Sequence, residues 1–358
     1  MRPGSRSTKS EKRCVWPGPV RFSVSPPPKP SERKGASANV SDSVPVLQLM
    51  QTKGLGPRAL SRLIDSLDQE NLTPAEFVAL SPKEMTGRFG LNEEQANTIR
   101  SNERIATELS ELLDRHNVRL FLRNSSSYPP RLQAVLKDKA PPVLFVGGDH
   151  DLLGHRGVGF CGARDASTEA LRCADQVARA LVQHGLLVVS GNAPGVDENA
   201  HRAALDSGGK TVVVAPEGIL QFRPRSSFAE LLTDDNFVAI SEFPPRLPWS
   251  VANAMQRNRT ICGLVHALIV IEAGISGGTW EAGHTALELR MPLFVLDYPN
   301  PAPSGQGNPR LLKKGGRPLL CRPGEPPDLT LLLEALELPL PSTRAGQPTL
   351  FDHLADGE

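Results

Sequence analysis

Short apolar runs alternate with amphipathic stretches through the middle of the chain. The first run ends near residue 162, and residues 168–184 then carry apolar positions at helical spacing. Buried strands that alternate with helices are typical of a parallel sheet that helices cover on both faces. The pattern therefore predicts an α/β fold. The expected strands lie at residues 158–162, 186–190, 211–215, 267–273 and 293–296.

The segments around this pattern differ in character and divide the chain into four parts. Residues 44–125 have helical spacing and predict a small helical domain of the helix-hairpin-helix or SAM-like kind. Residues 126–320 form the expected Rossmann-like domain, which opens over residues 128–146 with an extended linker and an edge strand. Residues 1–43, rich in Pro, Ser, Lys and Arg, are expected to be a disordered basic tail. Residues 321–358 are expected to form a short helix and a flexible tail.

A glycine-rich turn, Gly54-Leu-Gly-Pro57, separates two of the predicted helices. In a helix-hairpin-helix turn, glycine N–H groups can approach a DNA phosphate, and the dipole of the following helix adds attraction. The same glycines can equally be turns and caps within a helical bundle. Lys53 and Arg58 are the basic residues that flank the turn, and both interpretations stay open.

Charge and cysteine content narrow the class of protein. The net charge is +1, but residues 1–43 hold nine Lys/Arg and three Asp/Glu, or +6, which leaves −5 for the rest. Nucleic-acid binding by the folded part therefore requires a local basic pocket.

The five cysteines form no CxxC pair, so we expect no metal site and a reducing, cytoplasmic location. Cys161 and Cys262 lie in apolar stretches and are expected to be buried. No apolar run reaches 18 residues and no signal-peptide core is present, so no membrane segment is expected.

The glycines at 157, 159 and 162 formally match a dinucleotide-binding fingerprint. In a working fingerprint the glycines form the turn after the strand, whereas here the first two lie within the apolar run. The second run ends in Ser190-Gly191 instead of the Asp or Glu that would hold a ribose hydroxyl. A nicotinamide or flavin enzyme is therefore not predicted, and no cofactor is expected.

Arginine, glycine and hydroxyl residues follow several of the predicted strands. The carboxyl ends of parallel strands meet at one edge of a sheet. Arginine offers a planar set of donors to phosphate oxygens, and glycines at a helix N-terminus let N–H groups approach an anion. The loops therefore predict a phosphate-binding crevice, with two of its arginines in the first turn of a helix. Its predicted residues are Gly162, Ala163, Arg164, Ser190, Gly191, Gly195, Lys210, Arg257, Asn258, Arg259, Ser276, Gly277, Gly278 and Thr279.

Asp197, His201 and Glu272 are expected to order these loops. Asp197 can cap the helix that carries His201 one turn further on, and Glu272 can orient an arginine of the crevice. An Asp–His pair also fits an enzyme, and Glu281, which follows the glycines at 277 and 278, keeps that alternative open. No nucleophile motif or metal-ligand set accompanies these residues, so no catalytic residue and no metal are predicted.

Together the motifs resemble the DNA-processing protein A (DprA/Smf) family of recombination mediators, over about residues 45–320. The resemblance implies that the crevice binds single-stranded DNA. It also implies a homodimer that hands the strand to the RecA recombinase in transformation and recombination, without enzymatic activity. The motifs are Tyr128-Pro-Pro-Arg-Leu132, Gly162-Ala-Arg164, residues 190–201, Gly208-Gly-Lys-Thr211, Ser241-Glu242, and Arg257-Asn-Arg259 with Glu272-Ala273.

One segment departs from the family pattern. Residues 276–283 read Ser-Gly-Gly-Thr-Trp-Glu-Ala-Gly, which is closer to nucleotide phosphoribohydrolases, whose glycine-rich loop holds a phosphate beside a catalytic glutamate. The alternative functions are therefore a nucleotide phosphoribohydrolase that uses Glu281 or Glu272, and a nucleotide-sensing module of the same superfamily.

The C-terminal tail carries Gln347-Pro-Thr-Leu350-Phe351. This pentapeptide resembles those by which bacterial proteins bind the DNA polymerase sliding clamp. Leu350 and Phe351 would enter an apolar groove, while Gln347 would bond to backbone groups. The clamp is therefore a further expected partner.

Overall fold

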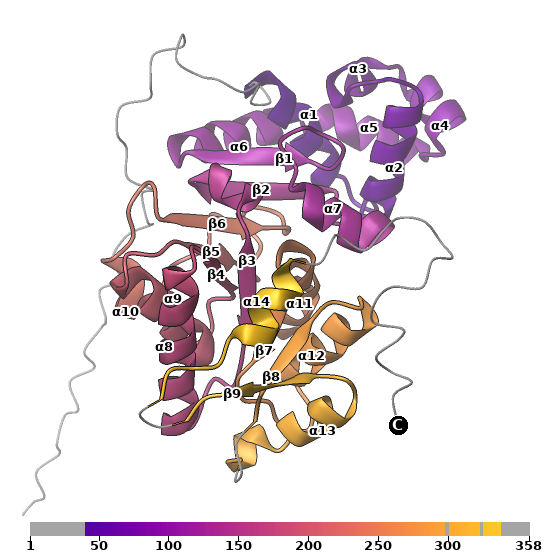
Figure 1. Ribbon diagram of the computed structural model, residues 1–358. Coiled ribbons are helices and arrows are strands. Elements are labelled where there is room, and N and C mark those ends of the chain that lie inside the picture. Colours follow the sequence, from indigo (N-terminus) through magenta and orange to yellow (C-terminus); the bar gives the residue numbers. More distant parts are fainter. Residues whose placement is uncertain (1–39, 298–300, 323–324, 338–358) are drawn as a thin grey trace, which may run out of the picture.

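The computed structural model describes residues 40–297, 301–322 and 325–337, and a nine-stranded sheet forms its centre (Figure 1). The strand order is β1-β2-β6-β5-β4-β3-β7-β8-β9. From β6 to β9 in this order every pairing is parallel, whereas β1 and β2 join antiparallel at one edge. The strands are β1 (Val118–Leu122), β2 (Val143–Gly148), β3 (Gly157–Cys161), β4 (Leu187–Ser190), β5 (Thr211–Val214), β6 (Phe237–Ser241), β7 (Ala267–Val270), β8 (Leu293–Asp297) and β9 (Arg317–Leu320).

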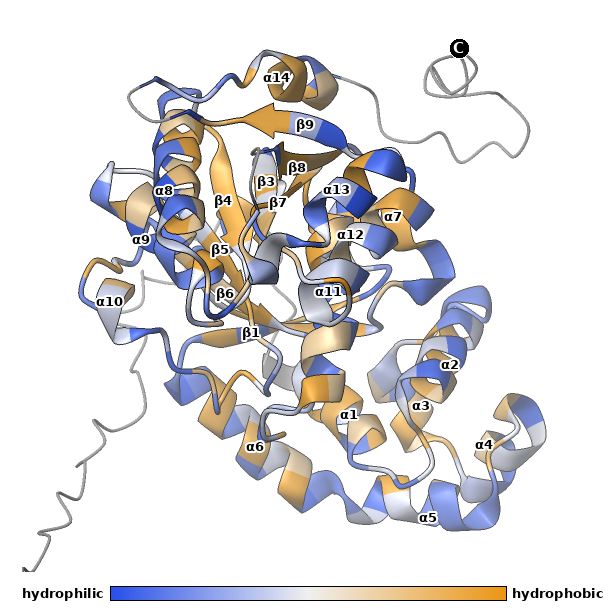
Figure 2. Ribbon diagram, turned by 90° about the horizontal axis from the view of Figure 1, so that it is seen from below, coloured by the Kyte–Doolittle hydropathy of each residue, from blue (hydrophilic) through white to orange (hydrophobic). Residues whose placement is uncertain are grey.

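Helices cover both faces of the parallel part, which gives the three layers seen in Figure 2. One face carries α8 (Thr168–Gln183) and α9 (Val196–Asp206), and the other carries α11 (Val251–Leu264) and α12 (Gly278–Glu288). The predicted Rossmann-like parallel sheet is therefore confirmed. Because β3 lies between β4 and β7, the chain reverses its direction of travel across the sheet there. Ligands of such sheets bind outside the carboxyl ends of the strands at this point.

Shorter helices complete the α/β part. Two of them pack with the flanking layers: α13 contributes Leu311 to the core under α11 and α12, and α14 contributes Leu332 to the core under α8. These shorter elements are α7 (Pro130–Leu136), η2 (Lys137–Lys139), η3 (His150–Gly154), α10 (Ser226–Ala229), η4 (Pro303–Gly305), α13 (Asn308–Lys313) and α14 (Thr330–Leu336).

Six helices precede the sheet: α1 (Val40–Met50), α2 (Pro57–Gln69), α3 (Pro74–Ala79), α4 (Pro82–Phe89), α5 (Glu93–Ser101) and α6 (Glu103–Arg115). Capping residues in the sequence determine where α3, α4 and α5 begin. Thr73, Ser81 and Asn92 each accept a bond from the backbone N–H three residues on, and the Glu or Gln there bonds back. The apolar core of these helices, with Phe77 and Met85 fully buried, continues onto β1, β2 and β5.

The structure corrects two expectations about the start of the sheet. Val118–Leu122 falls within the segment predicted to be helical, yet it forms strand β1 and pairs with β2. The segment predicted to be an extended linker contains helix α7, and β2 lies between β1 and β6 instead of at the edge. The β1 run is too short to show a period of its own, so its partner strand decides its conformation.

The burial of Cys161 and Cys262, at 6% and 0% exposure, confirms the prediction for these residues. Within the described ranges, no helix is long and apolar enough to cross a membrane. The tails at 1–39 and 338–358, which include the pentapeptide at 347–351, lie outside the described residues.

Candidate nucleic-acid interface

A crevice of about 1030 Å³ lies among the loops that follow β3, β4 and β5 and the first half of α11. These strands are neighbours and parallel, so their carboxyl ends open at one edge of the sheet. Four arginines against two glutamates give the lining a charge of +2 when all six are ionised. This is the kind of local basic pocket that a chain of near-neutral composition would need in order to bind nucleic acid. The charged and aromatic lining residues are Arg164, Arg223, Arg225, Arg257, Glu217, Glu230 and Trp249.

Arg257 enters the crevice from α11 and is only 5% exposed. Its guanidinium lies against Gly191, where a Cβ atom would fall 1.9 Å from Nη1. The end of β4 therefore requires glycine for this close approach. Neither Nε nor Nη1 of Arg257 has a hydrogen-bond partner among the described residues. A buried guanidinium with unused donors favours an anionic or strongly accepting group nearby.

Two buried carboxyl groups share the electrostatic field of Arg257. Burial raises the pKa of Asp197, and the charge of Arg257 opposes that rise. Burial also raises the pKa of Glu217, which Arg257, Arg225 and Arg223 again oppose. The positive charge of Arg257 is therefore partly balanced inside the protein, and the more exposed arginines supply most of the attraction at the mouth of the crevice.

Two glycines fix the loop that presents Arg164. A Cβ at Gly162 would fall 2.2 Å from Val196 Cγ2, and a Cβ at Gly195 would fall 2.4 Å from the Ala163 carbonyl oxygen. Gly195 also has φ +82°, a conformation that favours glycine. The Thr279 hydroxyl donates to the Gly162 carbonyl at 2.9 Å. These predicted residues thus hold the loop in shape, and the loop exposes Arg164 and the adjacent Asp165 to solvent.

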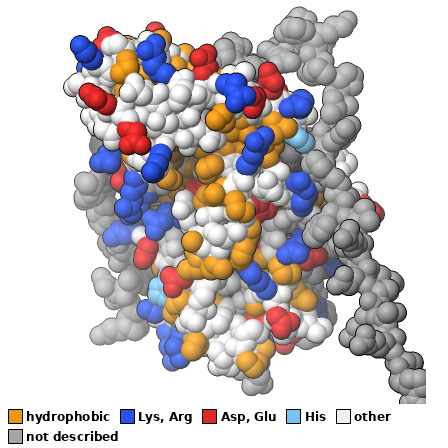
Figure 3. All heavy atoms as spheres, turned by 180° about the vertical axis from the view of Figure 1, so that it is seen from behind, with side chains coloured by type: hydrophobic (Ala, Val, Ile, Leu, Met, Phe, Trp, Pro, Cys, Tyr) orange, Lys and Arg blue, Asp and Glu red, His pale blue; other side chains and the backbone are white. Residues whose placement is uncertain are grey.

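Arg164 and Trp249 form the outer wall of the crevice. The Arg164 Cζ lies 5.4 Å from the centroid of the Trp249 ring, a cation–π arrangement, and Trp249 is 47% exposed. Two further apolar side chains on the first turns of α11, Val251 and Met255, are 63% and 40% exposed. Figure 3 shows the face opposite to that of Figure 1, where hydrophobic side chains gather in the middle with Lys and Arg on both sides. Exposed aromatic rings beside arginines are the elements on which single-stranded bases stack.

Sequence reasoning missed Arg223, Arg225 and Trp249. The two arginines follow β5 on the same edge of the sheet as the predicted loops, and this position was the available signal. Asn192 connects the loops after β4 and β5: its Nδ2 donates to the Arg223 carbonyl at 2.7 Å, and its own carbonyl accepts from Arg225 Nε at 3.2 Å. Nothing in the residue pattern placed Trp249 beside Arg164.

His201 lies beneath the crevice and is fully buried. Its Nε2 donates to the Gly191 carbonyl at 2.8 Å, and its Nδ1 lies 2.6 Å from the Thr211 hydroxyl, which itself donates to the Val188 carbonyl at 2.8 Å. Burial lowers the pKa of His201 to about 4. Both ring nitrogens are used in this way, so His201 does not make the bond to Asp197 that its spacing suggested. Asp197 lies in the first turn of α9, whose N-cap is Gly195, so it is not the capping residue that we expected; it accepts from the Ala193 N–H of the preceding loop.

Glu272 follows β7 and is fully buried. It accepts from the Ser167 N–H at 3.1 Å and from the Ser167 hydroxyl at 2.6 Å. Ser167 also caps α8, so these bonds join the end of β7 to the loop after β3 and to the start of a helix. These bonds give Glu272 a loop-ordering contact with the segment after β3.

Lys210 and Ser190 are among the predicted phosphate-binding residues that do not reach the crevice. Lys210 immediately precedes β5 and so lies at the amino end of the strands, the edge opposite the strand-end loops. Ser190 is fully buried, and its hydroxyl donates to the Phe160 carbonyl at 2.7 Å inside the sheet. The same section of sheet holds Gly157 and Gly159 within β3, which confirms that the dinucleotide pattern is out of register.

The pair Arg257 and Arg259 is divided between two sides of α11. The helix begins at Val251 after the capping residue Ser250, so both arginines lie in its middle and not in its first turn. Arg257 lines the crevice, whereas Arg259 lines a second hollow on the other side of the helix. Asn258 is 9% exposed and its amide donates to the Gly278 carbonyl at 3.1 Å, which fixes the start of α12.

The glycine-rich loop before α12 is exposed. Ser276, Gly277 and Gly278 are open to solvent, and Gly277 has φ +97° at the N-cap of the helix. Glu281, in the first turn of α12, is exposed as well. An exposed helix N-terminus of this kind attracts anions, although this loop is not part of the crevice lining.

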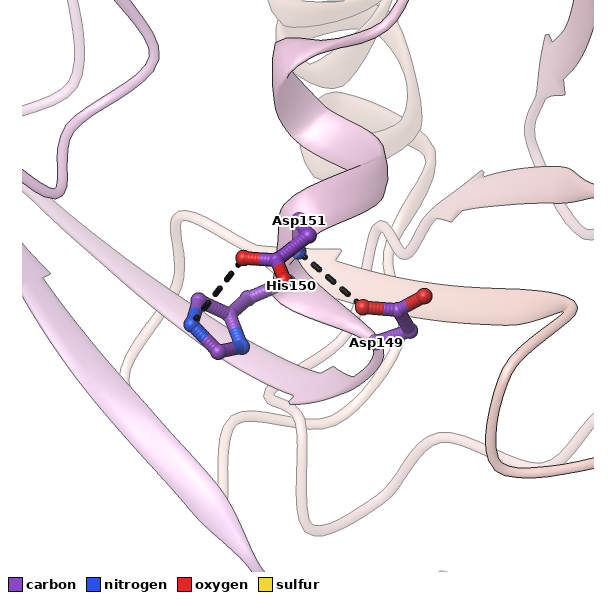
Figure 4. Close-up of side chains that lie close together, drawn as sticks. All are labelled: Asp149, His150 and Asp151. Atoms are coloured by element: carbon purple, nitrogen blue, oxygen red, sulfur yellow. Dashed lines mark hydrogen bonds and ion pairs between the residues drawn. The ribbon is translucent and has the colours of Figure 1, made fainter. Parts of the chain in front are cut away.

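One acidic cluster lies apart from the crevice. Asp149, His150 and Asp151 place one ligand atom each within 4.8 Å of one another at the start of η3 (Figure 4). His150 Nε2 is 2.9 Å from Arg119 Nη1 as well as 3.5 Å from Asp151 Oδ1. Burial and the adjacent Arg119 lower the pKa of His150. The guanidinium beside the imidazole opposes a metal cation, and we assign no metal site here.

The fold and the crevice together define a Rossmann-like protein with a basic binding site at the strand ends. The chain belongs to the family of DNA recombination-mediator protein A, whose family model matches residues 119–323. This confirms the resemblance that the motifs indicated.

Individual relatives agree with this membership. The chain is 32% identical over 239 residues to Protein Smf from Escherichia coli (strain K12), which covers 66% of this chain and 63% of that protein. It is 33% identical over 159 residues to DNA processing protein DprA from Streptococcus pneumoniae, which covers 44% of this chain and 56% of the relative. The chain thus spans less than two thirds of the length of these relatives. The X-ray structure of DprA from S. pneumoniae has the same fold, with a TM-score of 0.65 at 24% identity over 77% of this chain and 94% of that one.

Proposed function

We propose that this protein is a recombination mediator that binds single-stranded DNA in the crevice, through phosphates and with little sequence preference. The observation that carries the proposal is the joint presence of four arginines and an exposed tryptophan at the strand ends. Arginines bind the phosphates of any sequence. Trp249 offers a stacking surface, which requires unpaired bases and so favours a single strand over a duplex.

The test is titration of a labelled oligonucleotide at several salt concentrations with Arg164→Ala, Arg223→Ala and Trp249→Ala. Each arginine variant should bind more weakly, and the slope of log affinity against log salt should fall by about 0.7 per lost phosphate contact. Trp249→Ala should weaken binding by about 1–3 kcal/mol with an unchanged salt slope, because stacking is not ionic. Lys210→Ala, at the opposite edge, is the matched control. Parent-like binding by all three crevice variants would remove the basis of the proposal.

We further propose that the protein acts as a homodimer that hands the strand to the RecA recombinase, and that it breaks no bond. Membership of the recombination-mediator family supports this proposal. Sedimentation of the free protein measures the dimer, and RecA filament formation on protected DNA measures the handover. We also propose that residues 347–351 bind the DNA polymerase sliding clamp. The test is whether Phe351→Ala loses clamp binding.

The competing functions act on free nucleotides. Glu281 is exposed one turn into α12, after a glycine-rich loop, which is the arrangement that a phosphoribohydrolase would need. Incubation with nucleoside monophosphates, followed by chromatography for free base, separates this function from DNA binding. Base release that Glu281→Gln abolishes would replace the mediator proposal. Thermal stabilisation by free nucleotides without binding of oligonucleotides would indicate a nucleotide sensor.

A further inference from the structure

A second hollow, of about 1310 Å³, lies between the helical domain and α11. One wall is the first half of α2 with the turn before it, and the opposite wall is α11 with residues 138–142. We call this hollow the interdomain groove. Its basic lining residues are Arg58, Arg62, Lys139 and Arg259, and its acidic ones are Asp65, Asp138 and Glu242.

Two of the three acidic residues of the groove are neutralised at least in part, which leaves Asp138 against four basic side chains. Asp65 forms an ion pair with Arg123. Burial raises the pKa of Glu242 to about 7, so this group is partly protonated at neutral pH. Among the described residues, no ion pair involves any of the four basic side chains. Two of these, Arg58 and Arg62, are exposed on successive turns of α2. The groove therefore presents a positive surface despite its count of acids.

The N-terminus of α2 opens into the same groove. Its N-cap is Gly56, which has no side chain to bond the first N–H groups, and Pro57 follows at the first helical position. The first N–H groups of a helix have no partner within it, and here no capping side chain bonds to those of Arg58 and Ala59. Ser61 also lines the groove at 9% exposure and brings a hydroxyl to it. N–H groups, a hydroxyl and the positive end of a helix at one place favour a phosphate.

Helix α11 separates the interdomain groove from the crevice by the width of one helix. Ala254 and Arg257 line the crevice, whereas Gln256, Arg259 and Thr260 line the groove. A polymer that leaves one hollow across α11 therefore enters the other.

We propose that a single DNA strand held in the crevice continues across α11 into the interdomain groove, where Arg58, Arg62, Lys139, Arg259 and the α2 N-terminus bind its phosphates. No aromatic residue lines the groove, so its contacts are with the backbone of the strand and not with its bases. The inference rests on the proposed function, because it describes the remainder of the same strand. It also gives the glycine turn at 54–57 a binding role in addition to its role as a turn.

Oligonucleotide length separates the two sites. An oligonucleotide of about six nucleotides fills one site of this kind, and one of about 20 can span two. In Arg58→Ala/Arg62→Ala, affinity for the long strand should fall roughly tenfold and its salt slope by about 1.4, twice the ~0.7 per phosphate. Affinity for the short strand should stay at the parent value. Both arginines are exposed, so the variant should fold normally, which thermal unfolding checks.

Arg104→Ala/Arg115→Ala is the matched control, since it removes the same charge from exposed positions of the same domain, on α6. Its affinity for both lengths should equal that of the parent. The inference is overturned if Arg58→Ala/Arg62→Ala binds the long strand like the parent, or if it loses affinity for both lengths equally. A parent protein that binds neither length would instead overturn the proposed function, and that result is visible before any variant is made.

Discussion

Arg164 and Arg257 of the crevice have opposite environments. Arg164 is exposed and lies over the Trp249 ring, while Arg257 is 5% exposed and lies against Gly191 near two buried carboxyl groups. The first is placed to meet a ligand directly, and the second contributes a fixed charge beneath it. Both arginines were predicted from the sequence as phosphate ligands. Their difference in burial could not be predicted, because it depends on neighbours that are distant along the chain.

Gly191→Ala tests the close approach to Arg257. The added methyl group would fall 1.9 Å from Nη1, so the guanidinium must move away from its present position at the wall of the crevice. We expect a loss of about 1–3 kcal/mol in the free energy of unfolding, as for overpacked cores, and weaker binding of oligonucleotide. Denaturant unfolding and oligonucleotide titration measure the two effects.

Gly87→Ala is the control for this substitution. Gly87 lies within α4, is exposed, and has no atom within 4 Å of its added Cβ. Alanine there should stabilise the protein by about 0.5–1 kcal/mol, since glycine is unfavourable inside a helix. If Gly191→Ala is as stable as the parent and binds DNA equally well, the contact with Arg257 has no energetic importance.

At the scale of elements, most strands could be predicted because buried parallel strands are continuous apolar runs. β3, β4, β5, β7 and β8 lie where these runs predicted them. β1 could not be found in this way, because Arg119 interrupts its five residues. The start of α11 was misplaced because its first two turns carry exposed apolar side chains, Val251 and Met255, which hide the amphipathic period. That error put Arg257 and Arg259 on one surface, whereas the helix directs them to two.

His201 joins three elements, and its protonation links their packing to pH. The unfolded imidazole has a pKa near 6.5, whereas burial lowers the folded pKa to about 4. The unfolded state therefore binds the proton first, and stability falls as the pH drops from about 6.5 to about 4. The difference in pKa corresponds to about 3 kcal/mol.

His201→Gln isolates this effect. The variant is expected to be less stable at pH 7, because glutamine cannot bond both Thr211 and the Gly191 carbonyl in the same geometry. Its further loss of stability between pH 6.5 and 4.5 should be smaller than that of the parent. His266 and Glu242 titrate in both proteins, so the difference between the two urea-unfolding profiles belongs to His201. Parallel profiles would show that His201 is protonated in the folded state as readily as in the unfolded one.

At the scale of the whole molecule, the sheet and the helical domain share one core. β1 belongs to the sheet through its pairing with β2, yet Val118 and Leu120 pack with the helices that precede it. The interdomain groove exists because of this junction. Its walls come from residues 54–65, 138–142 and 242–260, and no local pattern brings these segments together. For this reason the sequence indicated a DNA-binding turn and a basic helix separately but could not indicate that they face one another.

Arg123 holds this junction, and its removal tests how far the two parts depend on each other. The side chain follows β1 and is 1% exposed. It donates to Asp65 and to the Ser61 carbonyl on α2, and also to the Asp138 carbonyl before β2. Arg123→Ala removes a buried cation with all of these bonds and leaves the buried Ser61 carbonyl without its donor, which costs roughly 2–4 kcal/mol.

We expect Arg123→Ala to destabilise the junction and not the whole protein. Amide hydrogen exchange should accelerate across α2 and residues 137–142, while β7 and β8, which lie beyond β3 in the strand order, should keep their protection. Affinity for a long oligonucleotide should fall with the loss of the groove, and affinity for a short one should not. Arg88→Ala removes an exposed ion pair with Glu70 and should change stability by less than about 1 kcal/mol. Uniform acceleration of exchange through both parts would mean that the helices and the sheet unfold as a single unit. Arg123 would then stabilise the whole protein and not the junction alone.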